Sequence, residues 1–166
     1  KIWVSNPGQE KRDRLSLDFQ INTTHSNIDA AKVADVIVLS VKPALIEVVC
    51  KELAETISGK NVLVMSVAAC VDSHDIVTWL GGDIAVVRAM PNTPAFLSAG
   101  ACVLCANFRV DEDQKSLAEH LFRAVGVVAW VKDDAEVNAL TPVSGSGPAY
   151  FFYLMKAMCD AAYEMG

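Results

Sequence analysis

The chain has little clustered positive charge and no long apolar run, and both absences exclude classes of partner. No basic stretch is longer than Lys11-Arg12, and the formal net charge is −6. Because binding to nucleic-acid phosphates needs clustered positive charge, no nucleic-acid partner is expected. No apolar run approaches the roughly 20 residues of a membrane-spanning helix, and the first residues show no signal-peptide pattern. The sequence therefore predicts a protein without a membrane partner.

Metal-ligand spacing is also missing from the five cysteines and three histidines. Cys102 and Cys105 are spaced like half of a zinc site, but they lie in a strand-like run and no second Cys/His pair follows. Residues three apart on a strand face opposite sides of the sheet. We therefore expect no metal, and reduced cysteines that fit a cytoplasmic protein.

What the chain does contain is an alternation of short apolar runs and amphipathic stretches. This alternation indicates strand–helix units around a parallel sheet, and the 52% hydrophobic content suits strands buried on both faces or a surface for a partner subunit. The pattern predicts an α/β fold with a doubly wound, Rossmann-type, mostly parallel sheet. The seven predicted strands cover residues 2–4, 19–22, 35–41, 61–68, 83–89, 101–107 and 127–131.

The helices between these strands show apolar faces at helical spacing. Leu45, Val49 and Leu53 predict the buried face of a helix that opens at Pro43. In the helix predicted over residues 111–125, the apolar face is assigned to Leu117, Leu121, Phe122 and Val125. A short helix is predicted over residues 135–140.

The last part of the chain has a different character. Residues 144–148, Ser-Gly-Ser-Gly-Pro, resemble a hinge, and Pro148 begins a helix that is apolar on nearly every face. We therefore divide the chain into a dinucleotide-binding domain, residues 1–143, and the hinge and first helix of a helical dimerisation domain, residues 144–166.

Loops at the carboxyl ends of parallel strands are where such sheets bind ligands. Four loops stand out here, over residues 5–8, 40–43, 67–70 and 90–94. Three of them have an ordinary alternative: the first can be a simple turn, Lys42 a solvated residue at a helix start, and residues 67–70 a buried strand end. Their occurrence after successive strands of one predicted sheet favours a common site.

Four motifs, in this order and spacing, resemble the pyrroline-5-carboxylate reductases. They are Val-Lys-Pro at 41–43, Ala-Ala at 68–69, Arg-Ala-Met-Pro-Asn-Thr-Pro at 88–94 and Ser-Gly-Ser-Gly-Pro-Ala-Tyr at 144–150. The resemblance extends over essentially the whole chain. It implies reduction of 1-pyrroline-5-carboxylate to L-proline, with hydride from the nicotinamide of NADPH, or of NADH in some members. It also implies a homodimer or larger homo-oligomer formed through the C-terminal helices.

The resemblance places twelve residues at the cofactor: Ser5, Asn6, Asn27, Ser40, Val41, Lys42, Pro43, Val67, Ala68, Ala69, Asn92 and Thr93. Ser5 and Asn6 would meet the adenosine ribose and its 2′-phosphate. Asn27 would lie beside the adenine. In Rossmann folds an acidic residue at the end of the second strand favours NAD. The strand at residues 2–4 corresponds to that second strand, because the family has one strand before the position of Lys1. Here Ser and Asn stand at its end instead, with Lys11 and Arg12 nearby.

The other half of the cofactor would meet the later loops. Residues 40–43 and 67–69 would line the nicotinamide half, and Asn92 and Thr93 would lie near the nicotinamide and the imine ring. The resemblance assigns no catalytic residue to this chain, because the groups that hold the substrate carboxylate come from later helices in the family.

The sequence departs from the family pattern in three ways. Cys70 stands where family members usually have glycine, and no Gly-x-Gly-x-x-Gly phosphate turn is present. In the family a first strand and helix precede the position of Lys1, and further helices follow the last residue. We therefore expect the chain to be incomplete at both ends and inactive alone, with the strands at residues 2–4 and 35–41 separated by one missing strand.

Two alternatives remain at this point. A β-hydroxyacid or 6-phosphogluconate type dehydrogenase shares the sheet but needs a catalytic lysine after it, for which Lys156 is the candidate. A non-catalytic Rossmann relic would account for the missing glycine turn.

Overall fold

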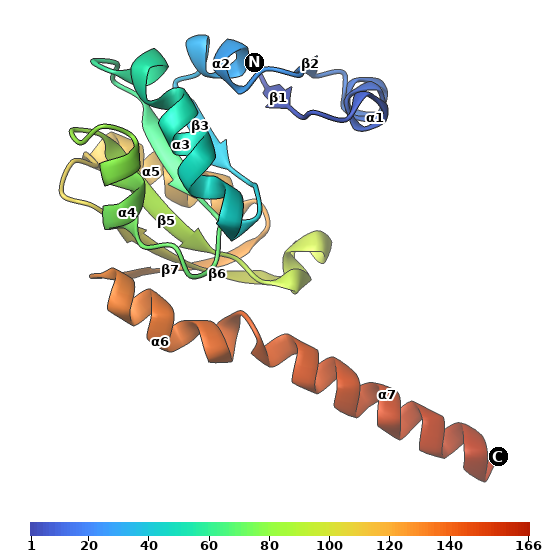
Figure 1. Cartoon of the computed structure of the whole chain (residues 1–166). Helices are drawn as coiled ribbons and strands as arrows, with labels where there is room; N and C mark the ends of the chain where they lie inside the picture. The colour runs from blue at the N-terminus through green and yellow to red at the C-terminus, as the bar shows by residue number, and fades with distance from the viewer.

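In the computed structural model, which describes residues 1–166, strands and seven α-helices alternate along most of the chain, and the strands form two sheets (Figure 1). The elements are β1 (Trp3–Ser5), α1 (Gln9–Phe19), β2 (Asn22–Thr24), α2 (Asn27–Lys32), β3 (Val36–Leu39), α3 (Pro43–Ile57), β4 (Leu63–Ser66), α4 (Ser73–Trp79), β5 (Ala85–Met90), the 3-10 helix η1 (Thr93–Leu97), β6 (Gly100–Ala106), α5 (Glu112–Arg123), β7 (Gly126–Val131), α6 (Asp134–Ser144) and α7 (Gly147–Met165).

The strands form one two-stranded and one five-stranded sheet. β1 pairs with β2 in parallel, and the larger sheet has the order β3-β4-β5-β6-β7. All neighbours in the larger sheet are parallel except β5 and β6. The predicted mostly parallel, Rossmann-type sheet is therefore confirmed. No ladder joins β1 to β3, which agrees with the break expected between these two strands.

Three predicted elements differ from the structure. The strand predicted over residues 19–22 begins only at Asn22, because α1 continues to Phe19 and ends at Gln20, whose φ is 53°. The strand predicted over residues 35–41 covers only Val36–Leu39, at the edge of the five-stranded sheet, and its Val38 is half exposed. The short helix at residues 135–140 extends to Ser144 with Pro142 inside it, so only two residues separate α6 from α7.

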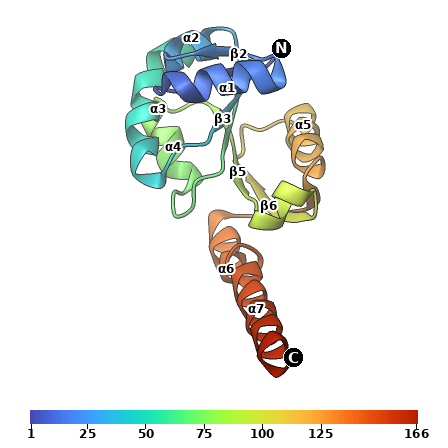
Figure 2. The same cartoon turned by 90° about the vertical axis from the view of Figure 1, so that its right-hand side faces the viewer.

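Helices cover both faces of the five-stranded sheet. α3 and α4 lie on one face and α5 on the other, as the two views show (Figures 1 and 2). On the first face Ile46, Cys50 and Ile76 pack against Val64 and Val86. On the second face α5 places Ala118 against residues of β4, β5 and β6. α6 lies on the same face as α4, where Val137 packs against Val103 and Cys105 of β6.

The buried faces of two helices differ from the sequence prediction. In α3 the fully buried residues are Ile46, Cys50, Leu53 and Ile57, whereas Leu45 is half exposed. In α5 only Ala118 is buried, with Phe122 packed beside it, and Leu117 and Leu121 are largely exposed. Apolar spacing located each helix, but the side facing the sheet is rotated by about one residue, so that Cys50 and Ala118 are buried against it.

The long helix α7 extends away from the rest of the chain (Figures 1 and 2). None of its residues is buried, although Phe151, Phe152, Leu154, Met155 and Met158 are all apolar. The boundary proposed between residues 143 and 144 falls at the last residue of α6, just before α7 begins at Gly147. No helix is both long enough and apolar enough to cross a bilayer.

Candidate functional site

Most of the predicted site residues lie at the ends of β1, β3, β4 and β5 or just after them. Since β3, β4 and β5 are parallel, residues 40–43, 67–69 and 92–93 lie at one edge of the five-stranded sheet. Ser5 is the last residue of β1, and Asn27 is the first residue of α2. The structure therefore groups the predicted residues by strand end, as the Rossmann fold requires.

Ser5 and Asn27 are in direct contact. The Ser5 hydroxyl donates a hydrogen bond of 2.6 Å to Asn27 Oδ1, and Asn27 Nδ2 donates one of 2.8 Å to Glu52 of α3. The two residues predicted to lie at the ribose and the adenine are thus neighbours, although they are 22 residues apart in the chain. Sequence reasoning missed Glu52, because nothing in the apolar pattern of α3 marks it.

The turn after β1 brings a cation close to Asn6. Asn6 Oδ1 accepts a hydrogen bond of 2.9 Å from the Gly8 amide, which closes the turn. Arg12 Nη1 donates to the carbonyls of Asn6 and Pro7 at 2.6 and 2.9 Å. The guanidinium of α1 is therefore positioned against the turn, and no carboxylate is hydrogen-bonded to Ser5 or Asn6.

In the loops after β3 and β4, backbone groups make the hydrogen bonds. Lys42 is the N-cap of α3, its side chain is exposed, and its carbonyl accepts a hydrogen bond of 2.8 Å from the Leu45 amide. Ala68 is buried, and its amide donates to Ser66 Oγ at 3.3 Å. Cys70 has φ 59°, the left-handed conformation that glycine adopts without strain. The position where the family usually has glycine therefore keeps the backbone that glycine favours.

Asn92 connects two elements at this edge. Its Nδ2 donates to the Ser144 carbonyl at 2.8 Å, and its Oδ1 accepts from the Ala101 amide at 2.8 Å. Both polar atoms of the side chain are therefore bonded within the chain, at the end of α6 and the start of β6. Thr93 begins η1 and is exposed. The predicted contact of Asn92 and Thr93 with the nicotinamide stays a prediction.

Known proteins match this chain from end to end. The pyrroline-5-carboxylate reductase of Pseudomonas aeruginosa is 45% identical over all of the chain and 60% of its own length. That of Vibrio alginolyticus is 42% identical over 99% of the chain and 60% of its own length. The chain belongs to the pyrroline-5-carboxylate reductase family. It spans about 60% of the length of these curated relatives.

Family models and solved structures agree with this membership. A model described as "NADP oxidoreductase coenzyme F420-dependent" matches residues 1–70, and "Pyrroline-5-carboxylate reductase dimerisation" matches residues 134–166. The reductase structure from Coxiella burnetii is 45% identical, with a TM-score of 0.93 over 99% of this chain and 61% of that chain. A Plasmodium falciparum pyrroline carboxylate reductase with NADP bound is 24% identical, with a TM-score of 0.87 over 99% of this chain and 59% of that chain. At that identity the second structure shows the shared fold.

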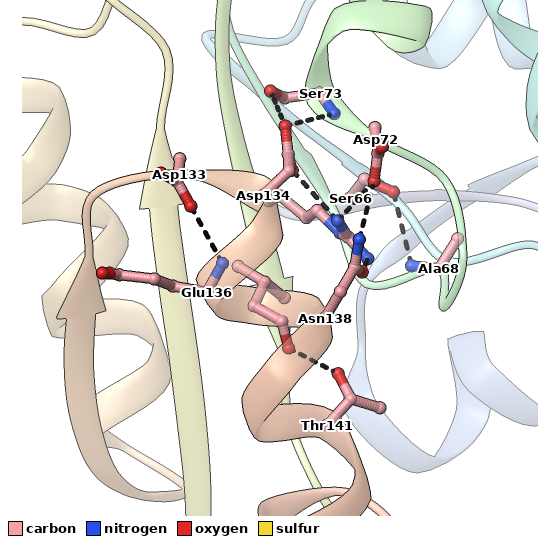
Figure 3. Close-up of polar contacts among 11 residues, drawn as sticks. Ser66, Ala68, Asp72, Ser73, Asp133, Asp134, Glu136, Asn138 and Thr141 are labelled. Carbon is pink, nitrogen blue, oxygen red and sulfur yellow. Dashed lines mark hydrogen bonds and ion pairs between the residues drawn. The ribbon is translucent and has the colours of Figure 1, made fainter.

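One cluster beside the site was not identified from the sequence. Arg88 of β5 is buried and makes ion pairs with Asp72 and Asp134, while Ser73 and Asn138 complete the group. Figure 3 shows Asp72, Ser73, Asp134 and Asn138 converging from two helix starts. An arginine inside an otherwise apolar strand was the available signal, but its partners could not be assigned without the fold.

Neither Cys102 and Cys105 nor Lys156 adds a reactive group near the site. Burial, followed by the negative charge of Asp134, raises the pKa of the Cys105 thiol to about 11. Burial raises the pKa of Cys102 to about 12, so both thiols remain protonated at neutral pH. The two cysteines pack on opposite faces of the sheet, which confirms the prediction for their spacing. Lys156 lies on the exposed helix α7, with its Nζ 2.6 Å from Asp160.

Proposed function

We propose that the protein reduces 1-pyrroline-5-carboxylate to L-proline with hydride from NADPH. The observation that carries the proposal is the 45% identity and 0.93 TM-score with the Coxiella burnetii reductase, over 99% of the chain and therefore over its strand-end loops. The dimerisation model that matches residues 134–166 supports the same family function. The exposed, ion-paired Lys156 gives no support to a dehydrogenase that depends on a catalytic lysine.

The residues present suit a phosphorylated dinucleotide. The turn at Ser5 and Asn6 offers a hydroxyl and an amide, and Arg12 is positioned against it at 2.6 Å from the Asn6 carbonyl. An acidic residue there would repel a 2′-phosphate, whereas these groups can bind one. NADP bound in the Plasmodium falciparum reductase supports the same choice of cofactor. We therefore assign NADPH as the preferred cofactor and place its adenosine half at Ser5, Asn6 and Asn27.

The role of this chain in the reaction is to orient the nicotinamide and the imine. NADPH supplies the hydride, and the chain needs to hold the nicotinamide face against the imine carbon and to exclude water. Residues 67–69 present small side chains and a backbone that a flat ring can approach closely. Residues 40–43 line the neighbouring strand end, and Asn92 and Thr93 border the imine. No side chain of this chain is required to act as a general acid, because an iminium already carries the proton.

The reductase proposal is tested by turnover of the complete protein. With 1-pyrroline-5-carboxylate, we expect NADPH oxidation and an equal amount of proline, measured by absorbance and by amino-acid analysis. β-Hydroxyacids with NADP are the control substrates and should give no detectable reduction of the cofactor. A folded, complete protein that forms no proline would overturn the proposal, and turnover of a hydroxyacid would favour the dehydrogenase alternative.

We also propose that the C-terminal helices, beginning with α7, join two or more copies of the chain, with residues 1–143 as the cofactor domain and residues 144–166 as the start of the dimerisation domain. α7 exposes apolar side chains along its length, and an exposed apolar patch of this kind drives association. The match of residues 134–166 to the dimerisation model supports a homo-oligomer. All five cysteines are free, which suits the cytoplasmic location that we propose.

A charge placed on α7 should disrupt this assembly. We expect the wild-type protein to be a dimer or larger, and the double variant F152E/M155E to shift towards monomer, because each glutamate would be buried without a partner. Light scattering after size-exclusion chromatography measures the mass. Phe108→Glu is the matched control, since Phe108 is 88% exposed but lies in the loop between β6 and α5. A monomeric wild type, or an equal shift in the control, would contradict the proposed interface.

A further inference from the structure

Arg88 is the one charged residue in the buried set, with only 1% of its surface exposed. A guanidinium removed from water is strongly unfavourable unless partners surround it. Nη1 lies 2.8 Å from Asp72 Oδ1 and 3.0 Å from Asp134 Oδ1, and Nη2 lies 2.8 Å from Asn138 Oδ1. Only Nε has no hydrogen-bond partner. The planar fork of donors is therefore used to bind three side chains at once.

The partners of Arg88 come from the first residues of two different helices. Asp72 is the N-cap residue of α4, but its side chain makes no capping hydrogen bond and instead contacts Arg88. The cap is supplied by α6: Asp134 Oδ2 accepts hydrogen bonds from the Ser73 amide at 3.1 Å and the Ser73 hydroxyl at 2.6 Å. Figure 3 shows the two hydrogen bonds that join Asp134 to Ser73. The start of α4 is thus capped by a residue 61 positions later in the chain.

Both helices lead to residues of the proposed cofactor site. The loop from β4 to α4 contains Ala68 and Ala69 and ends at Asp72. α6 begins at Asp134 and ends at Ser144, whose carbonyl accepts the hydrogen bond from Asn92. The Arg88 cluster therefore joins the loop expected at the nicotinamide to the start of α6, and Asn92 holds the other end of that helix.

We propose that Arg88 is a positioning residue for hydride transfer. By joining Asp72 to Asp134 and Asn138, it sets where residues 67–71 and α6 lie relative to β5, and it does so without contacting cofactor or substrate. The inference rests on the proposed reductase function. An apolar residue of similar size would fill the same space but would leave two carboxylates close together without a cation, so the role requires the guanidinium.

Hydrogen exchange tests the physical link without relying on activity. Arg88→Lys keeps the charge but loses the fork of donors, so it should loosen both helix starts. In the complete protein, amide exchange in residues 68–73 and in residues 134–138 should rise together by about tenfold. Arg109→Lys is the matched control, because Arg109 is half exposed and paired only with Asp83. Faster exchange in only one of the two segments, or in neither, would overturn the proposal.

Kinetics then distinguish positioning from general stability. Arg88→Lys should lower kcat about tenfold or more, because a small displacement of the reacting groups has a large effect on rate. The Kd of NADPH should change less than about threefold, since the adenosine half binds at the β1 turn, away from Arg88. Asp72→Asn and Asn138→Ala are two further variants, and each weakens or removes one contact of Arg88 while its other partners remain. Each should lower kcat about threefold or more.

The outcomes separate this proposal from the proposed function. Unchanged kcat per folded enzyme, with only a lower Tm, would show that Arg88 is structural and would overturn the positioning role. A wild-type protein without reductase turnover would overturn the proposed function, and the exchange experiment would still decide whether Arg88 links the two segments.

Discussion

Gly126→Ala is expected to prevent stable folding or to lower the free energy of unfolding by at least about 3 kcal/mol. Gly126 begins β7 opposite Gly100 of β6, with φ 155°. A Cβ at this position would overlap the Gly100 carbonyl and lie 2.6 Å from the Gly100 nitrogen. Since those atoms belong to the backbone of a paired strand, they cannot move without breaking the ladder between β6 and β7.

Urea denaturation of the complete protein, together with the soluble yield, measures this effect. Gly59→Ala is the matched control, because Gly59 has φ 69° but a Cβ there would meet nothing within 4 Å. Its expected loss is about 1 kcal/mol, from backbone conformation alone. If the two variants were equally stable, the close approach of β6 and β7 would not be the reason for glycine at position 126.

Asn6→Asp is expected to lower the preference for NADPH over NADH by about tenfold or more, because the new carboxylate would repel the 2′-phosphate. The aspartate can still accept the hydrogen bond from the Gly8 amide, so the turn should keep its shape. The comparison of kcat/KM for NADPH and NADH measures the preference. The change should appear mainly in the KM for NADPH, since the phosphate is remote from the hydride.

The control for this variant adds the same charge nearby. Asn22→Asp places a carboxylate at the start of β2, paired with Trp3 of β1 and away from the strand end. It should leave the ratio of NADPH to NADH efficiency within about twofold, because an exposed charge farther away is screened. An unchanged ratio in Asn6→Asp itself would place the 2′-phosphate elsewhere.

The start of a helix at Pro43 was predicted correctly from the sequence, and other helix starts are encoded just as locally. Ser26 caps α2, Pro43 opens α3, and Asp111 forms a capping box with Gln114 at the start of α5. These features depend on residues within four positions of each other, so composition and spacing contain the necessary information. For the same reason the four motifs, above all those at residues 88–94 and 144–150, were enough to identify the family.

Features that depend on distant residues were missed. Of the apolar faces assigned to α3 and α5, Leu53 and Phe122 pack in the core, but Leu45 and Leu117 are exposed. The Glu52 contact with Asn27 spans 25 residues, and Arg88 binds partners 16, 46 and 50 residues away. Nothing in a local pattern says which of several polar side chains a buried arginine will meet.

The sequence by itself determined the alternation of strands and helices, the loops of the proposed site and the family to which the chain belongs. Only the tertiary structure decided that Asp134 caps α4, that Asn92 joins β6 to α6, and that Arg88 holds two helix starts together. The physical reason is that periodicity and capping act over a few residues. Burial of a charge is compensated by whichever partners the fold brings within hydrogen-bonding distance.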